Sequence, residues 1–474
     1  MGFAEIPDGL PRRNPTVSYW QLPPHAIANH RTTAELPTST TFDYVIIGSG
    51  ITGAATAYKL LTRDANASIL MLEARTAASG ASGRNGGQCR AGWWLNFNKY
   101  AEKHGEEEAI KFEILEEQNV RDIAAFVREH DVDCDFQDVE TADACYTKEM
   151  FGKLCDVLDA RKEVYERLGV AQLTERKVWK GDDAVKHLGL PNLAGAITYP
   201  AHTQNPYLLV CRMLELSLDK GLNLQTNTPV YAVKPLPAAL RPSRHADWAV
   251  ETDRGVVRAK NVVLATNGHT NALHKGITDT EFLNPSRSQL TAICPRNGDL
   301  FHHPSLHKSV GLDDLNSGDY FLVRAPELKG AGDLVYGGGR FISRPKTTDD
   351  TIVHDGVAAY LHETAPKVFG EEAWGKNSNV VMDWSGITCY TPDTFPLVGA
   401  VPGEEGLWAS VGMNGHGMAM AFRSAEALVE MMTTGEEPDW FPKTFRIARA
   451  WRKEADGMQE ASAADLKEDY PGTS

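Results

Sequence analysis

The sequence predicts an α/β fold in which a doubly wound, Rossmann-like domain is combined with a discontinuous domain on a mixed β-sheet. Two observations carry this prediction. A short apolar strand at residues 42–47 runs directly into a G-x-G-x-x-G turn and a helix, and a second apolar strand at 68–72 ends in an acid. Later strand-like and helical runs alternate, with a central stretch that carries no such turn.

The first glycine turn has the composition of a nucleotide-binding fingerprint. Gly48 would make the tight turn, Gly50 would let a pyrophosphate approach the backbone, and Gly53 would let the helix pack on the strand. Free amides at the helix start near Ile51 would hold the pyrophosphate. Glu73 follows Gly53 by 20 residues, the spacing of a carboxylate that bonds ribose hydroxyls. This carboxylate would repel a 2′-phosphate, which disfavours NADP and leaves NAD or FAD.

The run SGASGRNGGQ, residues 79–88, favours FAD. In a plain NAD domain the second strand leads on to another helix, whereas these small residues let the backbone pass against something flat and bulky. The run resembles the family of FAD-dependent amino-acid and amine oxidoreductases (D-amino-acid, glycine and sarcosine oxidase-like), nearest its γ-glutamylputrescine-oxidoreductase-like branch. The resemblance implies that two serines approach the pyrophosphate and four residues line the flavin ring, namely Ser79, Ser82, Asn85, Gly86, Gly87 and Gln88.

Two later segments resemble parts of the same family. The strand at 261–268 ends in an A-T-x-G turn, which in the family returns under the adenosine half of FAD, so Val230 and Gly268 are implied contacts. The stretch 383–399 resembles a motif in which tryptophan, glycine and threonine-proline-aspartate recur, with Gly386 and Gly399 at matching points.

Residues 412–418, GMNGHGM, precede an apolar helix at 419–432. Reduced flavin is anionic at N1 and C2=O, and the amides at a helix N-terminus would stabilise that charge. The alternative is a sharp strand-to-helix turn without a ligand. The predicted FAD contacts are Gly48, Gly50, Ile51, Thr52, Gly53, Glu73, Ala74, Arg75, Ser79, Ser82, Asn85, Gly86, Gly87, Gln88, Val230, Thr266, Gly268, Gly386, Gly412, Gly415, His416, Gly417 and Met418.

The FAD is expected to be noncovalent. Some members of the resembled family attach flavin through a cysteine or histidine, but the resemblance does not put Cys389 at the sarcosine-oxidase attachment position. Cys89 lies next to the run that is implied to line the ring.

The predicted domains are interleaved along the chain. Residues 1–41 form an extended, proline-rich leader, and 437–474 form a C-terminal tail. The FAD-binding domain is assigned to 42–97, 195–280 and 381–436, and the substrate domain to 98–194 and 281–380. Helices are expected at 102–130, 150–168 and 206–220, with one strand at 224–233.

Composition excludes several classes of partner and site. The 474 residues carry a formal charge of −15, which argues against nucleic acid or an anionic membrane as partner. The seven cysteines are dispersed and no apolar stretch is long enough to span a bilayer, so a cytoplasmic protein is expected. Motifs for zinc hydrolases, P-loop proteins and serine hydrolases are absent, and no metal site is predicted. The oligomeric state is left open.

Four residues in or beside flavin-facing segments are candidates for catalysis: His416, Tyr320, Arg340 and His269. Arg340 could hold a substrate carboxylate with two parallel hydrogen bonds, although a surface ion pair is the alternative. The expected function is hydride transfer from a small-molecule C–H, of an amine or amino acid, to flavin N5, with reoxidation by oxygen or another acceptor. Oxidation of a hydroxyl group on a sugar-like metabolite is the alternative, and a flavin-binding protein without turnover is a remote one.

Overall fold

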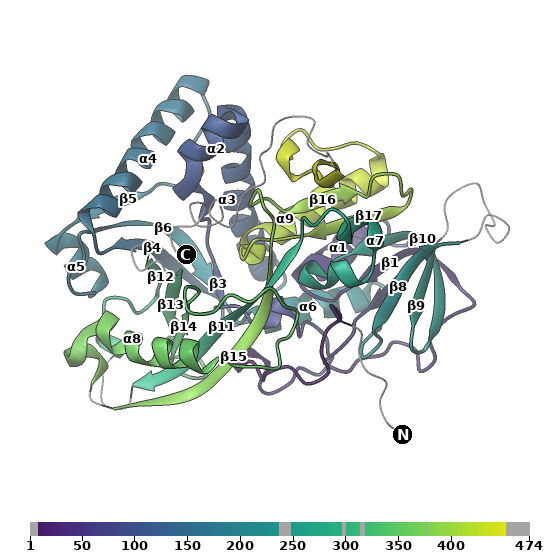
Figure 1. Ribbon diagram of the computed structural model, residues 1–474, viewed down its shortest axis with the longest axis horizontal. Helices are drawn as coiled ribbons and strands as arrows, with labels where there is room; N and C mark the ends of the chain where they lie inside the picture. Colours follow the sequence, from purple (N-terminus) through teal and green to yellow (C-terminus); the bar gives the residue numbers. More distant parts are fainter. Residues whose placement is uncertain (1–7, 237–247, 296–299, 313–317, 376, 452–474) are drawn as a thin grey trace.

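The computed structural model describes residues 8–236, 248–295, 300–312, 318–375 and 377–451, which form two β-sheets with helices packed around them (Figure 1). The first seven residues of the predicted leader and residues 452–474 of the predicted tail lie outside the described residues. The mixed α/β fold class is confirmed.

The first sheet is the doubly wound one. It contains eight strands of the described chain in the order β16-β17-β10-β1-β2-β7, with the hairpin β8–β9 attached to β10. Strands β17, β10, β1, β2 and β7 run parallel, whereas β16 pairs antiparallel with β17 and β9 pairs antiparallel with β10. The strands are β1 (Thr41–Ile47), β2 (Ile69–Leu72), β7 (Asn223–Gln225), β8 (Val230–Pro235), β9 (Trp248–Thr252), β10 (Gly255–Leu264), β16 (Leu397–Ala400) and β17 (Leu407–Val411).

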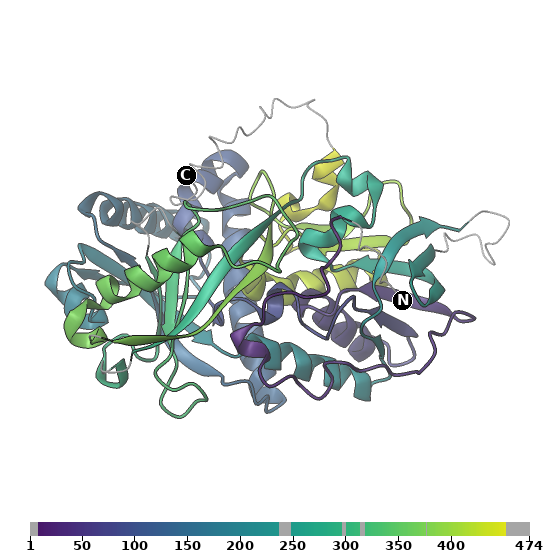
Figure 2. The ribbon, with the colours of Figure 1, turned by 60° about the horizontal axis from the view of Figure 1, so that its bottom comes forward.

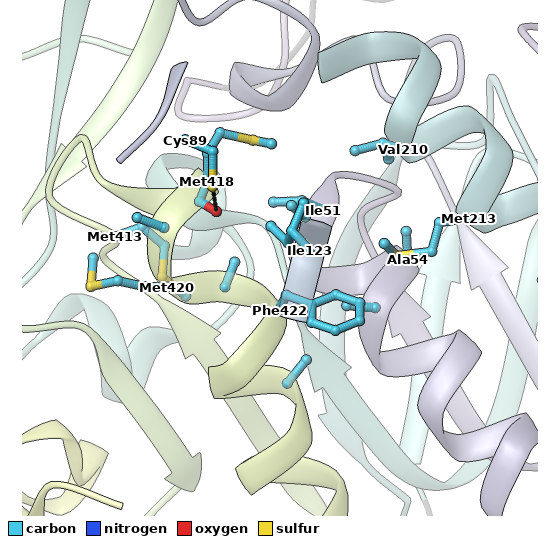
Figure 3. Packing of buried hydrophobic residues seen from close by; sticks show 14 of the residues in the cluster. Ile51, Ala54, Cys89, Ile123, Val210, Met213, Met413, Met418, Met420 and Phe422 are labelled. Carbon is cyan, nitrogen blue, oxygen red and sulfur yellow. Dashed lines mark hydrogen bonds between the residues drawn. The ribbon is translucent and has the colours of Figure 1, made fainter. Parts of the chain in front are cut away.

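Three helices cover one face of this sheet: α1 (Ile51–Arg63), α6 (Pro206–Asp219) and α9 (Gly417–Thr434). Asn205 caps α6 by accepting hydrogen bonds from the amides of Tyr207 and Leu208, so α6 begins at the predicted Pro206. Figure 3 shows the apolar side chains that join the starts of α1 and α9 to α3. These starts are therefore held against each other by the core.

The second sheet is mixed, as predicted. Within the described residues it has nine strands in the order β15-β11-β14-β13-β12-β4-β6-β3, with β5 beside β6. Only the β12–β4 pair is parallel among these neighbours. The strands are β3 (Gln88–Cys89), β4 (Gln137–Cys145), β5 (Lys177–Lys180), β6 (Gly195–Thr203), β11 (Asn284–Pro295), β12 (Lys308–Leu312), β13 (Asp319–Val323), β14 (Leu334–Gly337) and β15 (Ser378–Tyr390).

The remaining helices flank the second sheet and the junction between the two sheets (Figure 1), except α7, whose Ile277 packs in the core cluster of the first sheet. Figure 1 shows α2, α3 and α4 above the second sheet and α8 beside β14, β11 and β15. Their bounds are α2 (Phe97–His104), α3 (Glu106–Glu129), α4 (Lys148–Leu168), α5 (Asp182–Leu188), α7 (Lys275–Thr278) and α8 (Asp355–Trp374). Short 3₁₀ turns include η1 (Tyr19–Gln21), η2 (Ala81–Gly83), η3 (Trp93–Asn96) and η5 (Asn267–Ala272).

Two predicted elements are each broken by one residue with positive φ. The helix expected at 102–130 is two helices, because Gly105 has φ +89° and no helix continues through that conformation. The strand expected at 224–233 is also two, β7 and β8, with Asn227 at φ +48° between them.

Strand pairing also differs from two predicted domain boundaries. Residues 195–203 form β6, which pairs with β4 in the second sheet, although the FAD-binding domain was expected to resume at 195. Residues 381–390 likewise belong to β15, which pairs with β11 in the second sheet. We therefore propose that both strands belong to the substrate domain.

Candidate functional site

A cavity of about 640 Å³ is lined by residues from both sheets and from the loops between them. Its volume lies within the range of about 300–1,000 Å³ that ligand and cofactor sites occupy. Most of the predicted contacts meet there. The predicted residues that line it are Gly48, Gly50, Ile51, Thr52, Glu73, Ala74, Arg75, Ser82, Asn85, Gly86, Gln88, Val230, Thr266, Gly268, His269, Tyr320, Arg340, Gly386, Gly415, His416, Gly417 and Met418.

Four predicted contacts do not line the cavity: Gly53, Ser79, Gly87 and Gly412. Gly53 faces strand β1, where a methyl group would overlap the carbonyl oxygen of Gly48. Gly87 packs on Trp20 of the leader, and a methyl group at Gly87 would lie 2.9 Å from the Trp20 ring. Gly412 donates its amide to Asn267 Oδ1 at 3.0 Å. Gly53, Gly87 and Gly412 therefore contact neighbouring residues without lining the cavity themselves.

The glycine turn brings backbone to the cavity surface. Gly48 has φ +102°, and a methyl group there would lie 2.7 Å from the carbonyl oxygen of Ala265. A methyl group at Gly50 would lie 3.0 Å from Ser82 Oγ. Ser82 in turn accepts the Ile51 amide at 2.9 Å, at the start of α1. The backbone and the helix N-terminus are thus arranged as a pyrophosphate site requires.

Glu73 is fixed in place by a residue that the sequence analysis missed. Its Oε2 accepts hydrogen bonds from the amide and the hydroxyl of Ser49, at 3.0 and 2.7 Å, and its Oε1 accepts the Arg75 amide at 2.8 Å. The carboxylate remains on the cavity wall. Ser49 occupies a variable position of the fingerprint, 24 residues from Glu73, so the sequence gives no sign of this contact.

Two guanidinium groups on the cavity wall share one buried carboxylate. Asp350 accepts two hydrogen bonds from Arg75, at 3.0 and 2.9 Å, and lies 3.8 Å from Arg84 Nε. Burial and the neighbouring Arg75 lower the pKa of Arg84 to about 10, against the attraction of Asp350. Arg84 is therefore charged at neutral pH, and the cluster keeps one net positive charge. That charge suits a pyrophosphate, and neither Arg84 nor Asp350 was predicted to take part.

Tyr320 lies between two glycines. A methyl group at Gly86 would overlap its ring, and one at Gly337 would lie 2.6 Å from its Cζ. Gly337 pairs directly with Tyr320 across the sheet, and Gly311 pairs with it on the other side. Because glycine has no side chain, the Tyr320 ring can lie directly against Gly86 and Gly337, and Tyr320 lines the cavity.

The start of α9 is held by a buried carboxylate. Glu116 of α3 is fully buried, and its Oε2 accepts the amides of Gly92 and Trp93 at 2.7 and 2.8 Å. Its Oε1 lies 3.3 Å from Nδ1 of His416, the N-cap residue of α9. Cys89 adds a thiol hydrogen bond to the carbonyl of Met418 at 3.2 Å (Figure 3). The helix N-terminus is therefore fixed in direction as well as in position.

Arg340 stands beside this helix start. A methyl group at Gly415 would lie 3.9 Å from Nη2 of Arg340 and 3.7 Å from the hydroxyl of Tyr390. Burial raises the pKa of Tyr390, but Arg340 and Arg344 outweigh burial and bring it below the ordinary value. Desolvation raises the pKa of Tyr320 to about 12, with Arg340 acting in the opposite direction. The Tyr320 phenol and the Arg340 guanidinium therefore line the cavity, and the buried Tyr390 phenol lies near Gly415 without lining it.

His269 lines another part of the cavity. Its Nδ1 donates to the carbonyl of Gly9 at 2.9 Å. Desolvation lowers the pKa of His269, and the charged groups acting on it include Arg75, Asp350 and Glu73. This placement differs from the prediction of a catalytic residue, because Glu73 and Arg75 belong to the nucleotide end.

No described group of His, Cys, Asp and Glu residues is arranged to hold a metal ion. None of the helices in the described ranges is long and apolar enough to cross a membrane. None of the seven cysteines, all of which lie in the described residues, forms a disulfide, and none of them lines the cavity.

The cavity is bordered by a strand, a glycine turn, a helix start and an acid. This arrangement is the one that binds a nucleotide cofactor, and it defines the class of protein. The profile of the family described as "FAD dependent oxidoreductase" matches residues 43–431, and the chain belongs to this family. The resemblance drawn from residues 79–88 is thereby confirmed, and the cofactor is FAD.

Known proteins are similar over most of the chain. γ-Glutamylputrescine oxidoreductase of Escherichia coli (strain K12) is 22% identical over 396 residues, 83% of this chain and 84% of that one. Glycine oxidase from Geobacillus kaustophilus has a similar structure, with a TM-score of 0.66 and 18% identity over 86% of this chain and 99% of that one. FAD-bound L-α-glycerophosphate oxidase from Mycoplasma pneumoniae has a TM-score of 0.61 and 14% identity over 83% and 95%. The structural likenesses show the fold.

Proposed function

We propose that this enzyme oxidises the C–N bond of an amine or amino acid that carries a carboxylate. The observation that carries the proposal is the position of Arg340 on the cavity wall, beside Tyr320, Tyr390 and the start of α9. The names of γ-glutamylputrescine oxidoreductase and glycine oxidase among its relatives support an amine or amino-acid substrate.

The cavity residues divide into two groups in this proposal. The glycine turn, the α1 start, Glu73 and the Arg75–Arg84 pair would hold the adenosine and pyrophosphate of FAD. Asn85, Gly86, Gln88 and residues 415–418 would lie along its ring. Bound FAD would accept the two electrons and proton of the substrate C–H as hydride at N5. Oxygen or another acceptor would then reoxidise it. Because no cysteine lines the cavity in the described residues, noncovalent attachment remains our proposal.

The substrate end would position the reacting carbon. A guanidinium binds a carboxylate through two parallel hydrogen bonds, which fixes both distance and orientation. The neutral Tyr320 phenol could donate a further hydrogen bond to the substrate, because its pKa of about 12 keeps it protonated. Glu116 would keep the His416 ring in place at the helix start. A cytoplasmic location belongs to the same proposal and is supported by the seven dispersed cysteines, none of which forms a disulfide in the described residues.

Oxidation of a hydroxyl group is the second candidate. An L-α-glycerophosphate oxidase shares the fold, and the cofactor end of the cavity would be the same for either substrate. The two candidates differ in which compounds reduce the flavin, and a protein without turnover would show no reduction at all.

The test is anaerobic reduction of the bound flavin. Amino acids and amines are expected to bleach its absorbance, and polyols are not. Arg340→Met is expected to raise the amino-acid concentration for half-maximal bleaching about 10- to 100-fold, because a hydrogen bond to a charged group contributes about 1.5–3 kcal/mol. Arg340→Lys keeps the charge but loses the paired geometry, so its effect should be smaller.

Arg128→Met is the matched control. Arg128 pairs with Asp138 at 57% side-chain exposure and does not line the cavity, so bleaching should be unchanged. Bleaching by polyols alone would establish the second candidate. Failure of every metabolite fraction, with FAD bound stoichiometrically, would mean that the protein binds flavin without turnover.

A further inference from the structure

The N-terminal strap, which we define as residues 8–16, lies outside the stretch 43–431 that matches the family profile, yet it forms part of the cavity. Figure 2 shows the N-terminal part of the chain running along the outside of the molecule. The strap has no regular secondary structure. The family profile does not reach the strap, and the glycine fingerprint gives no indication of its contacts.

The strap is attached to the turn after β10 at its first end. The Gly9 carbonyl accepts the hydrogen bond from His269 Nδ1 at 2.9 Å. Gly9 has φ +88°, and a methyl group there would lie 3.0 Å from Cβ of Ala272. A side chain at this position would therefore be strained by its backbone and crowded by η5. His269, which sequence analysis placed in catalysis, is an anchor of the strap.

Two strap residues are part of the cavity wall. Leu10 is 3% exposed and packs in the apolar cluster that also contains Val230 and Leu273. Leu10 and Pro11 line the cavity together with these two residues and Glu73. An apolar slot thus adjoins the carboxylate that is proposed to bind ribose. A purine base has flat apolar faces, and its ring would fit this slot next to its own sugar.

The second end of the strap is held by the same charged cluster that faces the pyrophosphate. The carbonyl of Arg12 accepts a hydrogen bond from Arg75 Nη1 at 3.3 Å, and that of Thr16 accepts one from Arg84 Nη1 at 2.7 Å. The Thr16 amide donates to the Asp350 carbonyl at 2.8 Å. Both guanidiniums therefore bind the strap and line the cavity at once.

We propose that the strap forms the outer wall of the site for the adenosine half of FAD, with Leu10 and Pro11 facing the base. The proposal rests on the placement of adenosine at the Glu73 end of the cavity. Because the strap crosses this end, FAD can leave only when the strap moves. Loss of its contacts should therefore speed dissociation of FAD and weaken the binding of adenine nucleotides.

The experiment compares purified holoenzymes carrying Leu10→Ala, a deletion of residues 2–12, and Val17→Ala. Val17 is 53% exposed, directly follows the strap and does not line the cavity, so it is the matched control. Release of FAD is followed by the rise in flavin fluorescence after dilution. We expect the deletion and Leu10→Ala to raise the dissociation rate and Kd at least tenfold, and Val17→Ala to stay within twofold.

Binding of AMP and of riboflavin to the apoprotein gives a second readout. The strap variants should bind AMP at least fivefold more weakly and riboflavin unchanged, whereas a generally damaged protein would lose both ligands. Circular dichroism of each variant establishes that it is folded. If the deletion variant is unfolded, Leu10→Ala decides the question by itself.

Glu73→Gln separates the two parts of the argument. If Glu73→Gln weakens AMP binding and a folded strap variant does not, the strap is not a wall of the site. If neither change affects AMP binding, adenosine does not lie at the Glu73 end, and the strap proposal fails with that placement. Either result leaves the substrate proposal intact, because that proposal is tested by flavin bleaching.

Discussion

At the scale of single residues, the substrate end of the cavity is controlled by the balance between Arg340 and the phenols beside it. Tyr320 stays protonated to about pH 12, whereas Arg340 and Arg344 hold the pKa of Tyr390 below its ordinary value of 10.0. A Tyr390 phenolate would neutralise Arg340 by direct attraction. The charge that a substrate carboxylate needs therefore depends on the protonation of a neighbouring phenol.

This balance predicts a pH dependence of substrate binding. As the pH rises through the lowered pKa of Tyr390, its phenol loses a proton and the new negative charge competes with the substrate carboxylate for Arg340. The amino-acid concentration for half-maximal flavin bleaching should therefore rise as the pH increases toward 10. Tyr390→Phe should remove the part of this rise that does not come from the substrate's own amine. Identical pH profiles for the two enzymes would contradict the role of Tyr390.

At the scale of elements, the nucleotide end depends on how closely α1 packs on β1. Gly53 lies in the first turns of α1, directly against the carbonyl oxygen of Gly48 at the end of β1. The close approach allows the helix N-terminus to reach the cavity, where Ile51 and Ser82 meet. The third glycine of the fingerprint thus acts through packing, without touching the cavity.

Two glycine-to-alanine substitutions test this packing. Gly53→Ala forces its methyl group onto the Gly48 carbonyl and should lower the free energy of unfolding by about 3 kcal/mol or more, with loss of FAD. Gly152 lies inside α4 with no atom within 4 Å of an added methyl group, so Gly152→Ala should stabilise the protein by about 0.5–1 kcal/mol. Denaturant unfolding of both variants measures the difference, and equal effects would refute the packing argument.

At the scale of the whole molecule, the cofactor cavity joins the two sheets. Gly48 and Glu73 follow strands of the first sheet, whereas Tyr320 and Gly386 belong to strands of the second, and all four line the cavity. Arg84 reaches Ser385 of β15 with a hydrogen bond of 2.9 Å, which ties the glycine-rich run to the second sheet. A ligand in the cavity would therefore stabilise both sheets together.

Removal of FAD should lower the stability of the entire molecule. With free FAD at 100 times its Kd, binding stabilises the folded state by about 2.7 kcal/mol. An unfolding entropy of about 2.1 cal/mol/K per residue over 474 residues converts this to a Tm difference of about 3 °C. Calorimetry of the apoprotein and the holoenzyme should show every unfolding transition moving upward with FAD. A transition that does not move would mean that one sheet unfolds independently of the site.

The sequence predicted the family and the cofactor from short motifs, and both are confirmed. The fingerprint at 48–53 and the turn at 412–418 depend on glycine conformations, and the acid at 73 was predicted from its spacing to the fingerprint. The structure brings residues from all three to one cavity. We propose a different domain assignment for β6 and β15 than the sequence suggested, because a strand sequence does not show which sheet it will join. Helix 102–130 was divided by one glycine whose φ the periodicity does not reveal.

The amino-acid order alone was enough to indicate the cofactor and the family, since both depend on local backbone chemistry around glycines and one acid. Tertiary structure alone decided which distant side chains complete the site. Asp350 reaches Arg75 across 275 positions of the chain, His269 reaches Gly9 across 260, and His416 faces Glu116 from another helix. These pairings arise from the packing of two sheets and a leader around one cavity, and no spacing within the sequence encodes them.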